Sequence, residues 1–276
     1  MFDNLKKRLK KYPKIRKTLR TIINYTYVYV KNGYYKNMLL YFVKYRNSEK
    51  RALKKYGFRK SKIHNTHFWR YNDGTDRVYR RYYSAFLNDK KVFVKICKND
   101  STAQNEIKIY KYLASFDIPF LLKAESHSLD FNKGYSMLSL DFCTNLKPFA
   151  IPSTVDEFSN YCRQFLAIIG ELNKIKLLHA DIHKNNLVLN DKDELCLLDF
   201  GISISQNVEN SVNYLARPGT YYIQNDNIRI YDDAYSFVKM VEQLNPRKEF
   251  LECDEYKQVC EKIDEFSIRL DMNQFK

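Results

Sequence analysis

Apolar and polar positions alternate along the chain in ways that predict both strands and helices. Residues 91–96 read KVFVKI, an alternation typical of a strand. Residues 187–198 contain two short apolar runs joined by a polar turn, which predicts a buried hairpin. From 155 to 174 apolar residues recur at helical spacing, and Ser153 or Thr154 can cap that helix. We therefore expect strands in the first half and mainly helices in the second.

The N-terminal segment has its own pattern. Apolar residues recur there at intervals of three and four among many Lys and Arg, which predicts a basic amphipathic helix. The apolar positions are Phe2, Leu5, Leu9, Tyr12, Ile15 and Leu19. Pro13 would kink that helix or begin a second one. The apolar runs at 22–30 and 38–43 are each well short of the roughly 20 residues that cross a bilayer, and they lack the features of a cleaved signal peptide.

Charge is unevenly distributed along the chain. The 276 residues contain 47 Lys and Arg against 32 Asp and Glu. Residues 1–62 hold 20 of the basic residues and only Asp3 and Glu49, a net charge of +18, whereas the rest has 27 basic and 30 acidic residues, a net charge of −3. Such a segment suits an anionic membrane surface or an anionic envelope glycan. Helices packed on the rest of the protein are an equal alternative, and nucleic-acid binding is the least favoured.

Composition limits the class of protein further. With 45% hydrophobic residues, the chain can bury a substantial core. Its six cysteines include no CxxC pair, and several lie within apolar runs. We therefore expect the reduced thiols of a cytosolic protein and neither a disulfide framework nor a zinc site.

A carboxylate, an amide and a second carboxylate surround the predicted hairpin. Asp181 is followed five residues later by Asn186 and thirteen beyond that by Asp199. The hairpin would bring Asn186 and Asp199 to the same end, where their oxygens suit a hard Mg²⁺ ion. Asp181 could hold a hydroxyl group and receive its proton. These residue types, in this order, are what phosphoryl transfer from Mg·ATP requires.

This segment resembles the catalytic and metal-binding loops of the protein-kinase-like superfamily, which includes protein, aminoglycoside, choline and lipopolysaccharide-core kinases. Residues 179–186 match the pattern H-x-D-x-x-x-x-N, and residues 199–201 read D-F-G. The resemblance implies ATP as the phosphate donor, Asp181 as the catalytic base, and Asn186 and Asp199 as ligands of Mg²⁺.

Other segments are similar to further parts of that superfamily. Lys95 stands where the V-A-I-K strand has its lysine, which implies a contact with the α- and β-phosphates. Glu106, eleven residues later, is its implied partner. The backbone at Asp141 and Phe142 would be the hinge that meets adenine. Asp233 would begin a helix that braces the catalytic loop and would accept backbone hydrogen bonds there.

The chain also departs from the kinase pattern. The pair Gly219-Thr220 resembles the end of a kinase activation segment. Ala180 stands where many protein kinases have an Arg that can pair with a phosphate on this segment, so we expect no control by its phosphorylation. His183 stands where Ser/Thr kinases have Lys, as in small-molecule kinases, and Lys184 next to it could supply the cation instead. The local pattern leaves the choice between these two catalytic residues open.

The predicted phosphate-covering turn, residues 72–75, has one glycine where the superfamily often has three. Gly74 can supply the positive φ that a tight hairpin needs. In one interpretation its backbone contacts the phosphates and the side chains of Arg77 and Arg80 compensate for the missing glycines. In the other, the turn is a plain hairpin with no ligand.

These observations predict an α+β protein with a bilobal, protein-kinase-like fold. Residues 1–62 would form the basic helical extension, 63–141 a small lobe of antiparallel strands with the Glu106 helix, and 142–276 a mostly helical, shortened large lobe. The expected function is transfer of the ATP γ-phosphate to Ser/Thr of a protein or to a sugar hydroxyl of an envelope or lipid-linked glycan. The alternative is a pseudokinase scaffold that recruits a partner to an anionic membrane. We expect a cytoplasmic protein, peripheral at the inner face of the membrane.

Overall fold

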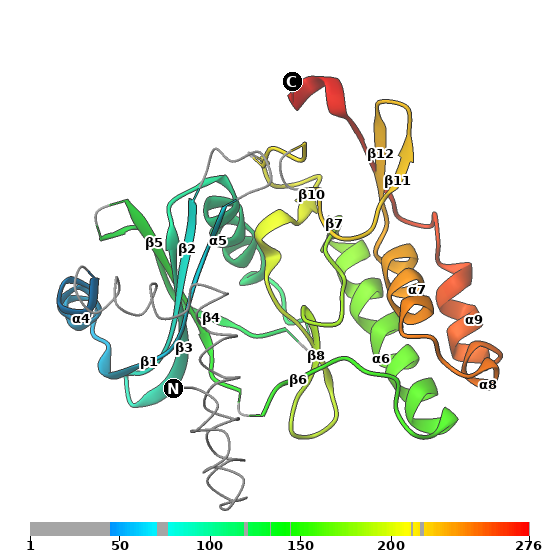
Figure 1. Cartoon of the computed structure of the whole chain (residues 1–276), viewed down its shortest axis with the longest axis horizontal. Helices are drawn as coiled ribbons and strands as arrows, with labels where there is room; N and C mark the ends of the chain where they lie inside the picture. The colour runs from blue at the N-terminus through cyan, green and yellow to red at the C-terminus, as the bar shows by residue number, and fades with distance from the viewer. Residues whose placement is uncertain are drawn as a thin grey trace, which may run out of the picture.

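The chain folds into two lobes, a small lobe built on one sheet and a larger, mainly helical lobe (Figure 1). This confirms the α+β, bilobal fold expected from the sequence. The computed structural model describes residues 45–70, 77–118, 121–132, 134–143, 145–210, 212–215 and 218–275. Gly74 and the basic amphipathic helix expected near the N-terminus lie outside these residues. Within the described ranges, no helix combines the length and the apolar character needed to cross a membrane.

The small lobe is an antiparallel sheet with the strand order β1-β2-β3-β5-β4. Its strands are β1 (Arg59–Arg70), β2 (Arg77–Leu87), β3 (Lys90–Lys98), β4 (Ala124–Asn132) and β5 (Tyr135–Asp141). In β3, Val92, Val94 and Ile96 are fully buried, as the alternating pattern predicts. Helix α5 (Ser101–Leu113) follows β3 and is capped by Asp100, whose carboxylate accepts a hydrogen bond from a first-turn amide at 3.0 Å. Strand β3 and helix α5 therefore hold Lys95 and Glu106 on adjacent elements.

Helix α4 (Arg46–Lys55) packs against the small-lobe sheet through a buried ion pair. Glu49 pairs with Arg81 of β2 and accepts a hydrogen bond from the Tyr83 hydroxyl at 2.6 Å. The Arg81 guanidinium lies 4.9 Å from the ring centroid of Tyr45 and 4.3 Å from that of Tyr135. Residues 45–62, assigned from the sequence to the N-terminal extension, thus form α4 and the start of β1 and pack on the small lobe.

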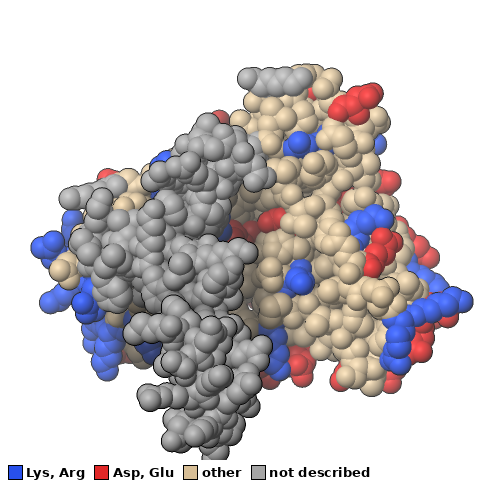
Figure 2. All heavy atoms as spheres, viewed as in Figure 1, with Lys and Arg blue, Asp and Glu red and all other residues tan. Residues whose placement is uncertain are grey.

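The outer face of α4 is basic. The helix buries Glu49 and Leu53 and exposes five Lys and Arg side chains. These are Arg46, Lys50, Arg51, Lys54 and Lys55. In Figure 2, Lys and Arg atoms gather at the left end of the molecule, over the small lobe, whereas the large lobe shows charges of both signs.

Replacing Glu49 with Gln is expected to lower the free energy of unfolding by about 3–5 kcal/mol, because the buried Arg81 guanidinium then lacks its counter-charge. Urea denaturation at pH 7 measures the change. The control is Glu171→Gln, which removes a half-exposed charge paired with Lys174 on one helix and should cost less than about 1 kcal/mol. Equal losses in the two variants would contradict the role given to the buried pair.

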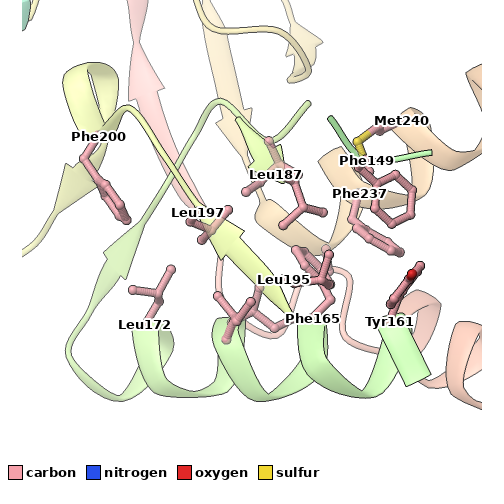
Figure 3. Packing of buried hydrophobic residues seen from close by; sticks show 14 of the residues in the cluster. Phe149, Tyr161, Phe165, Leu172, Leu187, Leu195, Leu197, Phe200, Phe237 and Met240 are labelled. Atoms are coloured by element: carbon pink, nitrogen blue, oxygen red, sulfur yellow. The ribbon is translucent and has the colours of Figure 1, made fainter. Parts of the chain in front are cut away.

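The large lobe is organised around helix α6 (Val155–Lys174). Thr154 and Glu157 form a capping box, in which each side chain accepts a hydrogen bond from the backbone amide of the other at 3.3 Å. The hairpin of β8 (Leu187–Leu189) and β9 (Leu195–Leu197) lies against this helix, where Leu195 is buried near Phe165 (Figure 3). Phe165 stacks on Phe237 of α7 (Asp233–Gln243), with the ring centroids 4.1 Å apart. The capped helix and the hairpin are both confirmed.

The other large-lobe elements are short. They are β6 (Lys147–Pro148), β7 (Leu177–Leu178), η2 (Phe200–Ile202), β10 (Ile204–Ser205), β11 (Ile223–Asn225), β12 (Ile228–Tyr231), α8 (Lys248–Leu251), α9 (Asp254–Glu261), β13 (Ile268–Asp271) and η3 (Met272–Phe275). Strands β11, β12 and β13 form a sheet that the sequence analysis did not predict, because strands of three or four residues are too short to show a clear alternation. All six cysteines lie in the described ranges and have free thiols.

Candidate active site

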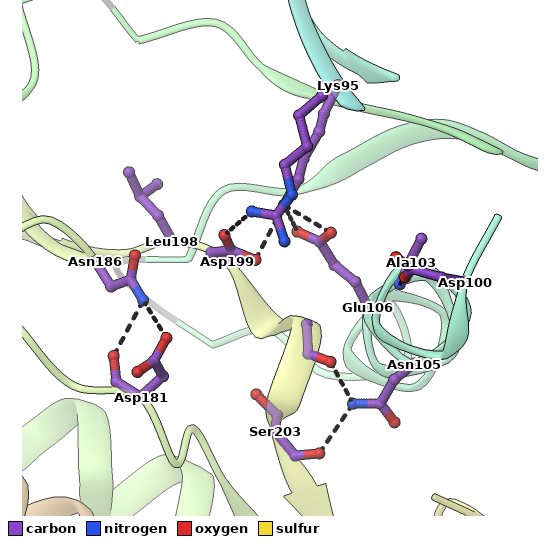
Figure 4. Close-up of polar contacts among 12 residues, drawn as sticks. Lys95, Asp100, Ala103, Asn105, Glu106, Asp181, Asn186, Leu198, Asp199 and Ser203 are labelled. Atoms are coloured by element: carbon purple, nitrogen blue, oxygen red, sulfur yellow. Dashed lines mark hydrogen bonds and ion pairs between the residues drawn. The ribbon is translucent and has the colours of Figure 1, made fainter. Parts of the chain in front are cut away.

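Three charged residues from three elements meet between the lobes. Lys95 of β3 places its Nζ 2.8 Å from Glu106 Oε1 of α5 and 3.0 Å from Oδ1 of Asp199, which follows β9 (Figure 4). The side chains of Lys95 and Glu106 are only 6% and 4% exposed, and that of Asp199 is 28% exposed. The structure therefore brings together Lys95, expected to bind phosphates, its expected partner Glu106, and Asp199, one of the two expected metal ligands.

Mutual attraction outweighs burial in its effect on the pKa values of Lys95 and Asp199. Burial alone would lower the pKa of Lys95, but the carboxylates of Asp199 and Glu106 outweigh burial and raise that pKa above its ordinary value. Burial would likewise raise the pKa of Asp199, but the cations of Lys95 and Arg80 hold it well below its usual range. Lys95 and Asp199 are thus both charged at neutral pH.

Arg80 of β2 completes the contacts of Asp199. Its Nη1 lies 2.8 Å from Asp199 Oδ2, and its side chain is 15% exposed. Lys95 binds the other carboxylate oxygen, so each oxygen of Asp199 faces a cation. The sequence analysis considered Arg80 only as a partner of phosphates; its contact with Asp199, 119 residues away, had no local signal.

The catalytic-loop residues form a second cluster. Asn186 Nδ2 donates to the Asp181 carbonyl at 3.0 Å and to Asp181 Oδ2 at 3.1 Å. The Thr220 hydroxyl donates to Asp181 Oδ1 at 2.7 Å, and His183 Nε2 lies 3.7 Å from Oδ2. Because Nδ2 of Asn186 is used within the loop, its amide oxygen is the atom suited to a cation. The sequence analysis noted Thr220 as part of a segment but missed its contact with Asp181.

The catalytic loop is braced from beneath by Asp233. This buried carboxylate accepts hydrogen bonds from the amides of His179 at 2.7 Å and Ala180 at 2.9 Å. The His179 ring, in turn, bonds to the Leu198 carbonyl through Nε2 at 2.9 Å, which ties the catalytic loop to the residue before Asp199. The bracing role predicted for Asp233 is confirmed.

A cavity of about 270 Å³ lies beside these charged groups. It is lined by Tyr82, Phe93, Lys95, Glu106, Leu122, Leu140, Asp141, Cys143, Leu146, Asn185, Asn186, Leu198 and Asp199. One wall is apolar and the other holds Lys95, Asp199 and Asn186, which suits a ligand with a flat apolar part and a charged part. The sequence analysis did not name the apolar wall, because its members come from both lobes.

The predicted hinge residues differ in their placement. Asp141 lines the cavity, with its carboxylate paired to Lys90 and its amide donating to the Lys123 carbonyl at 3.0 Å. The ring of Phe142 lies 3.8 Å from the Lys91 ammonium. Cys143, one residue further, lines the cavity.

A second pocket, of about 330 Å³, lies beside Thr220, whose hydroxyl donates to Asp181. Its lining includes His183, Lys184, Thr220 and Tyr221. Of the two candidate cations, His183 is the one that the structure brings next to the Asp181 carboxylate. Burial lowers the pKa of His183 although Asp181 opposes that shift, so its ring is neutral near pH 7.

The donor set fits Mg²⁺ bound together with a nucleotide. Asn186 and Asp199 offer amide and carboxylate oxygens on one wall of the cavity that Lys95 also lines. In the described part of the chain, no group of three or more His, Cys, Asp or Glu side chains is arranged to hold a metal alone. A Mg²⁺ ion here would take its remaining ligands from phosphates and water, which is its usual preference.

Gly219 fits closely against the catalytic loop. Its φ is +79°, and an added Cβ would lie 2.5 Å from the Ala180 carbonyl oxygen. Gly219→Ala should therefore shift Thr220 away from Asp181 and lower the kcat of the phosphate transfer expected from the sequence about 100-fold. Steady-state kinetics with a thermal unfolding curve test this. Gly134→Ala is the matched control, because Gly134 has φ +81° but open space around its Cβ, and it should lose stability without losing kcat.

Comparison with known proteins agrees with this geometry. Residues 158–233 match the ABC1 atypical kinase-like domain. Cyclin-dependent kinase 7 from Xenopus laevis is 29% identical over 104 residues, which cover 38% of this chain and 30% of that protein. Serine/threonine-protein kinase dst1 from Dictyostelium discoideum is 42% identical over 48 residues, covering 17% of this chain and 6% of that protein.

A third relative, the probable serine/threonine-protein kinase mkcD from the same organism, is 36% identical over 58 residues, which cover 21% of this chain and 9% of that protein. The matched parts thus span less than a third of the length of each of these relatives. The matched domain, residues 158–233, includes most of α6 and the loops around Asp181 and Asp199. The matched segment and these relatives thus show that the chain resembles the protein-kinase-like superfamily.

Proposed function

We propose that this chain transfers the γ-phosphate of Mg·ATP to a hydroxyl group. The observation that carries the proposal is the convergence of Lys95, Glu106, Asp199 and Asn186 on one cavity, with Asp181 hydrogen-bonded to Asn186 at its edge. This is the set of charges that phosphoryl transfer needs, because the reaction depends on positioning and on neutralising phosphate oxygens.

Each residue has a role that follows from its contacts. Lys95, held in place by Glu106, would bind the α- and β-phosphates. Asn186 and Asp199 would hold Mg²⁺, which neutralises negative charge on the phosphate oxygens when bound. Asp181 would orient the acceptor hydroxyl and take its proton. The Thr220 hydroxyl, which donates to Asp181, positions that carboxylate.

Two acceptor classes fit the site. A protein Ser or Thr is supported by the Gly219-Thr220 segment beside Asp181 and by the names of the relatives. A sugar hydroxyl of an envelope or lipid-linked glycan is supported by His183, by Ala180 in place of Arg, and by the short large lobe. The pocket lined by His183 and Lys184 is of a size for a compact acceptor.

The basic N-terminal segment would hold the enzyme at an anionic membrane surface. The charge of this segment and the five exposed Lys and Arg of α4 would attract any anionic surface. We favour a membrane over nucleic acid because the predicted N-terminal helix also has an apolar stripe. Salt-sensitive sedimentation of the full chain with anionic vesicles tests it. Unchanged sedimentation after deletion of residues 1–20 would refute the part assigned to the predicted helix.

A pseudokinase scaffold is the second candidate function. It is favoured by the occupation of both Asp199 carboxylate oxygens by Lys95 and Arg80 and by the single glycine in residues 72–75. In this case the chain would recruit a partner and transfer no phosphate.

The deciding experiment is transfer of labelled γ-phosphate from Mg·ATP into a cell lysate split into protein and glycolipid fractions. The native chain is compared with Asp181→Asn and with the exposed-turn variant Asp191→Asn. Label in one fraction, lost only with Asp181→Asn, would establish the enzyme and its acceptor class. No transfer by the folded native chain into either fraction would refute the proposal and favour the scaffold.

A further inference from the structure

We propose that Arg80 closes the metal site while no nucleotide is bound and exchanges Asp199 for the nucleotide phosphates when Mg·ATP enters. This inference rests on the proposed function, because it concerns the same cavity. Arg80 would have two successive partners, the Asp199 carboxylate and then a nucleotide phosphate.

Both carboxylate oxygens of Asp199 already face a cation. Lys95 Nζ lies 3.0 Å from Oδ1 and Arg80 Nη1 lies 2.8 Å from Oδ2. A divalent cation that approached Oδ2 would stand beside the guanidinium, and two cations at that separation repel each other strongly where side chains are mostly buried. Arg80 must therefore leave Oδ2 before that oxygen can bind a metal ion.

Strand β2 sets the direction in which Arg80 can turn. Along β2, Tyr82 pairs with Lys95 of β3 and Arg80 pairs with Cys97. Side chains alternate along a strand, so Arg80 lies on the same face as Tyr82, which lines the nucleotide cavity with Lys95. In the sequence, Arg80 is also two residues nearer than Tyr82 to residues 72–75, the turn expected to cover the phosphates.

The neighbouring arginine shows the contrast. Arg81 points to the opposite face, is fully buried, and pairs with Glu49 between two tyrosine rings. That arrangement serves the fold. Arg80 keeps 15% of its side chain exposed and pairs with the acid that a metal ion has to reach. A planar guanidinium is also well suited to bind phosphate with two hydrogen bonds.

Charge balance supports the exchange. Without a ligand, the cations of Lys95 and Arg80 face the carboxylates of Glu106 and Asp199. Mg·ATP brings a metal ion for Asp199 and a net negative charge for the two cations. Residues 72–75 contain one glycine where the superfamily often has three. Arg80 would then supply a phosphate contact in place of those that the two missing glycines would allow. Metal and nucleotide binding should be strongly coupled as a result.

The test measures binding by the full-length protein and needs no turnover. Titration calorimetry gives the affinity for Mn²⁺ alone, for ATP without metal, and for adenosine. We expect Arg80→Met to bind Mn²⁺ alone about tenfold more tightly and ATP about tenfold more weakly, with adenosine unchanged. Arg80→Lys keeps the charge and should lie between Met and the native chain. Arg59→Met removes an exposed arginine with the same charge change and should alter none of the three affinities.

Three outcomes would overturn the inference. Mn²⁺ affinity that stays the same or falls in Arg80→Met would show that Arg80 does not close the metal site. Unchanged ATP affinity in Arg80→Met would show that Arg80 does not bind phosphates. With either result, phosphate transfer by the native chain would still support the proposed function. If the native chain binds no nucleotide at all, the proposed function fails together with the inference. Arg80→Gln repeats the test if thermal unfolding shows that the Met variant is not folded.

Discussion

Replacing Asp181 with Asn is expected to lower kcat about 10²–10⁴-fold and to leave the affinity for nucleotide unchanged. The amide cannot take the proton of the acceptor hydroxyl. It has nearly the same shape as the carboxylate, and its single oxygen can still accept the hydrogen bond from Thr220. The bond from Asn186 Nδ2 to the other carboxylate oxygen would be lost, but the bond from Nδ2 to the backbone carbonyl of residue 181 remains, so the loop should keep its geometry. Steady-state kinetics with varied ATP measure kcat and the KM for ATP, and a thermal unfolding curve shows whether the variant is folded.

The interpretation of that variant depends on its control. Asp191→Asn makes the same chemical change in the exposed turn of the β8–β9 hairpin and should leave kcat unchanged. A fall in kcat below tenfold for Asp181→Asn would mean that the carboxylate is not the base. A rise in the KM for ATP with constant kcat would place Asp181 among the groups that bind nucleotide.

The activation segment is held by aromatic packing on the side where many kinases use an arginine. Ala180 lies in an apolar cluster with Tyr214, Tyr231 and Met272. The Tyr231 hydroxyl donates to the Pro218 carbonyl at 2.8 Å, one residue before Gly219. The segment next to Asp181 is therefore held by apolar packing and by the hydrogen bond from Tyr231. The absence of control by phosphorylation stays a prediction.

Features set by neighbouring residues could be predicted from the sequence. The cap of α6 at Thr154 and the β8–β9 hairpin each depend on side chains a few positions apart. Lys95 and Glu106 lie on a strand and a helix that follow each other directly in the chain. The catalytic-loop brace at Asp233 was also predictable, because its local pattern resembles that of kinases.

Features set by distant residues could not be predicted. Arg80 meets Asp199 across 119 residues, and Arg81 meets Glu49 inside a helix whose sequence is strongly basic. Such pairs have no periodicity, so only the folded chain shows which of two adjacent arginines faces the cavity. The same reason applies to the pairing of β13, because its partner strand lies about 40 residues earlier. Strands β11 and β12 are close in sequence but too short to show a clear alternation.

Lys95→Met should have the second large effect, on stability and on catalysis together. It leaves the buried Glu106 without its cation, which is expected to lower the free energy of unfolding by about 3–5 kcal/mol. It also removes the ammonium group that would bind the phosphates, with an expected loss of about 10²–10³ in kcat/KM. Lys111→Met on the exposed face of α5 is the control and should change neither quantity appreciably.

The double variant Lys95→Met/Glu106→Leu separates the two effects. Replacing both members of a buried ion pair with apolar groups is often neutral, so the free energy of unfolding should return close to the native value. Transfer should stay low, because no ammonium group faces the phosphates. If transfer recovered along with stability, Lys95 would matter only for folding, and the charge at the phosphates would have to come from Arg80 alone.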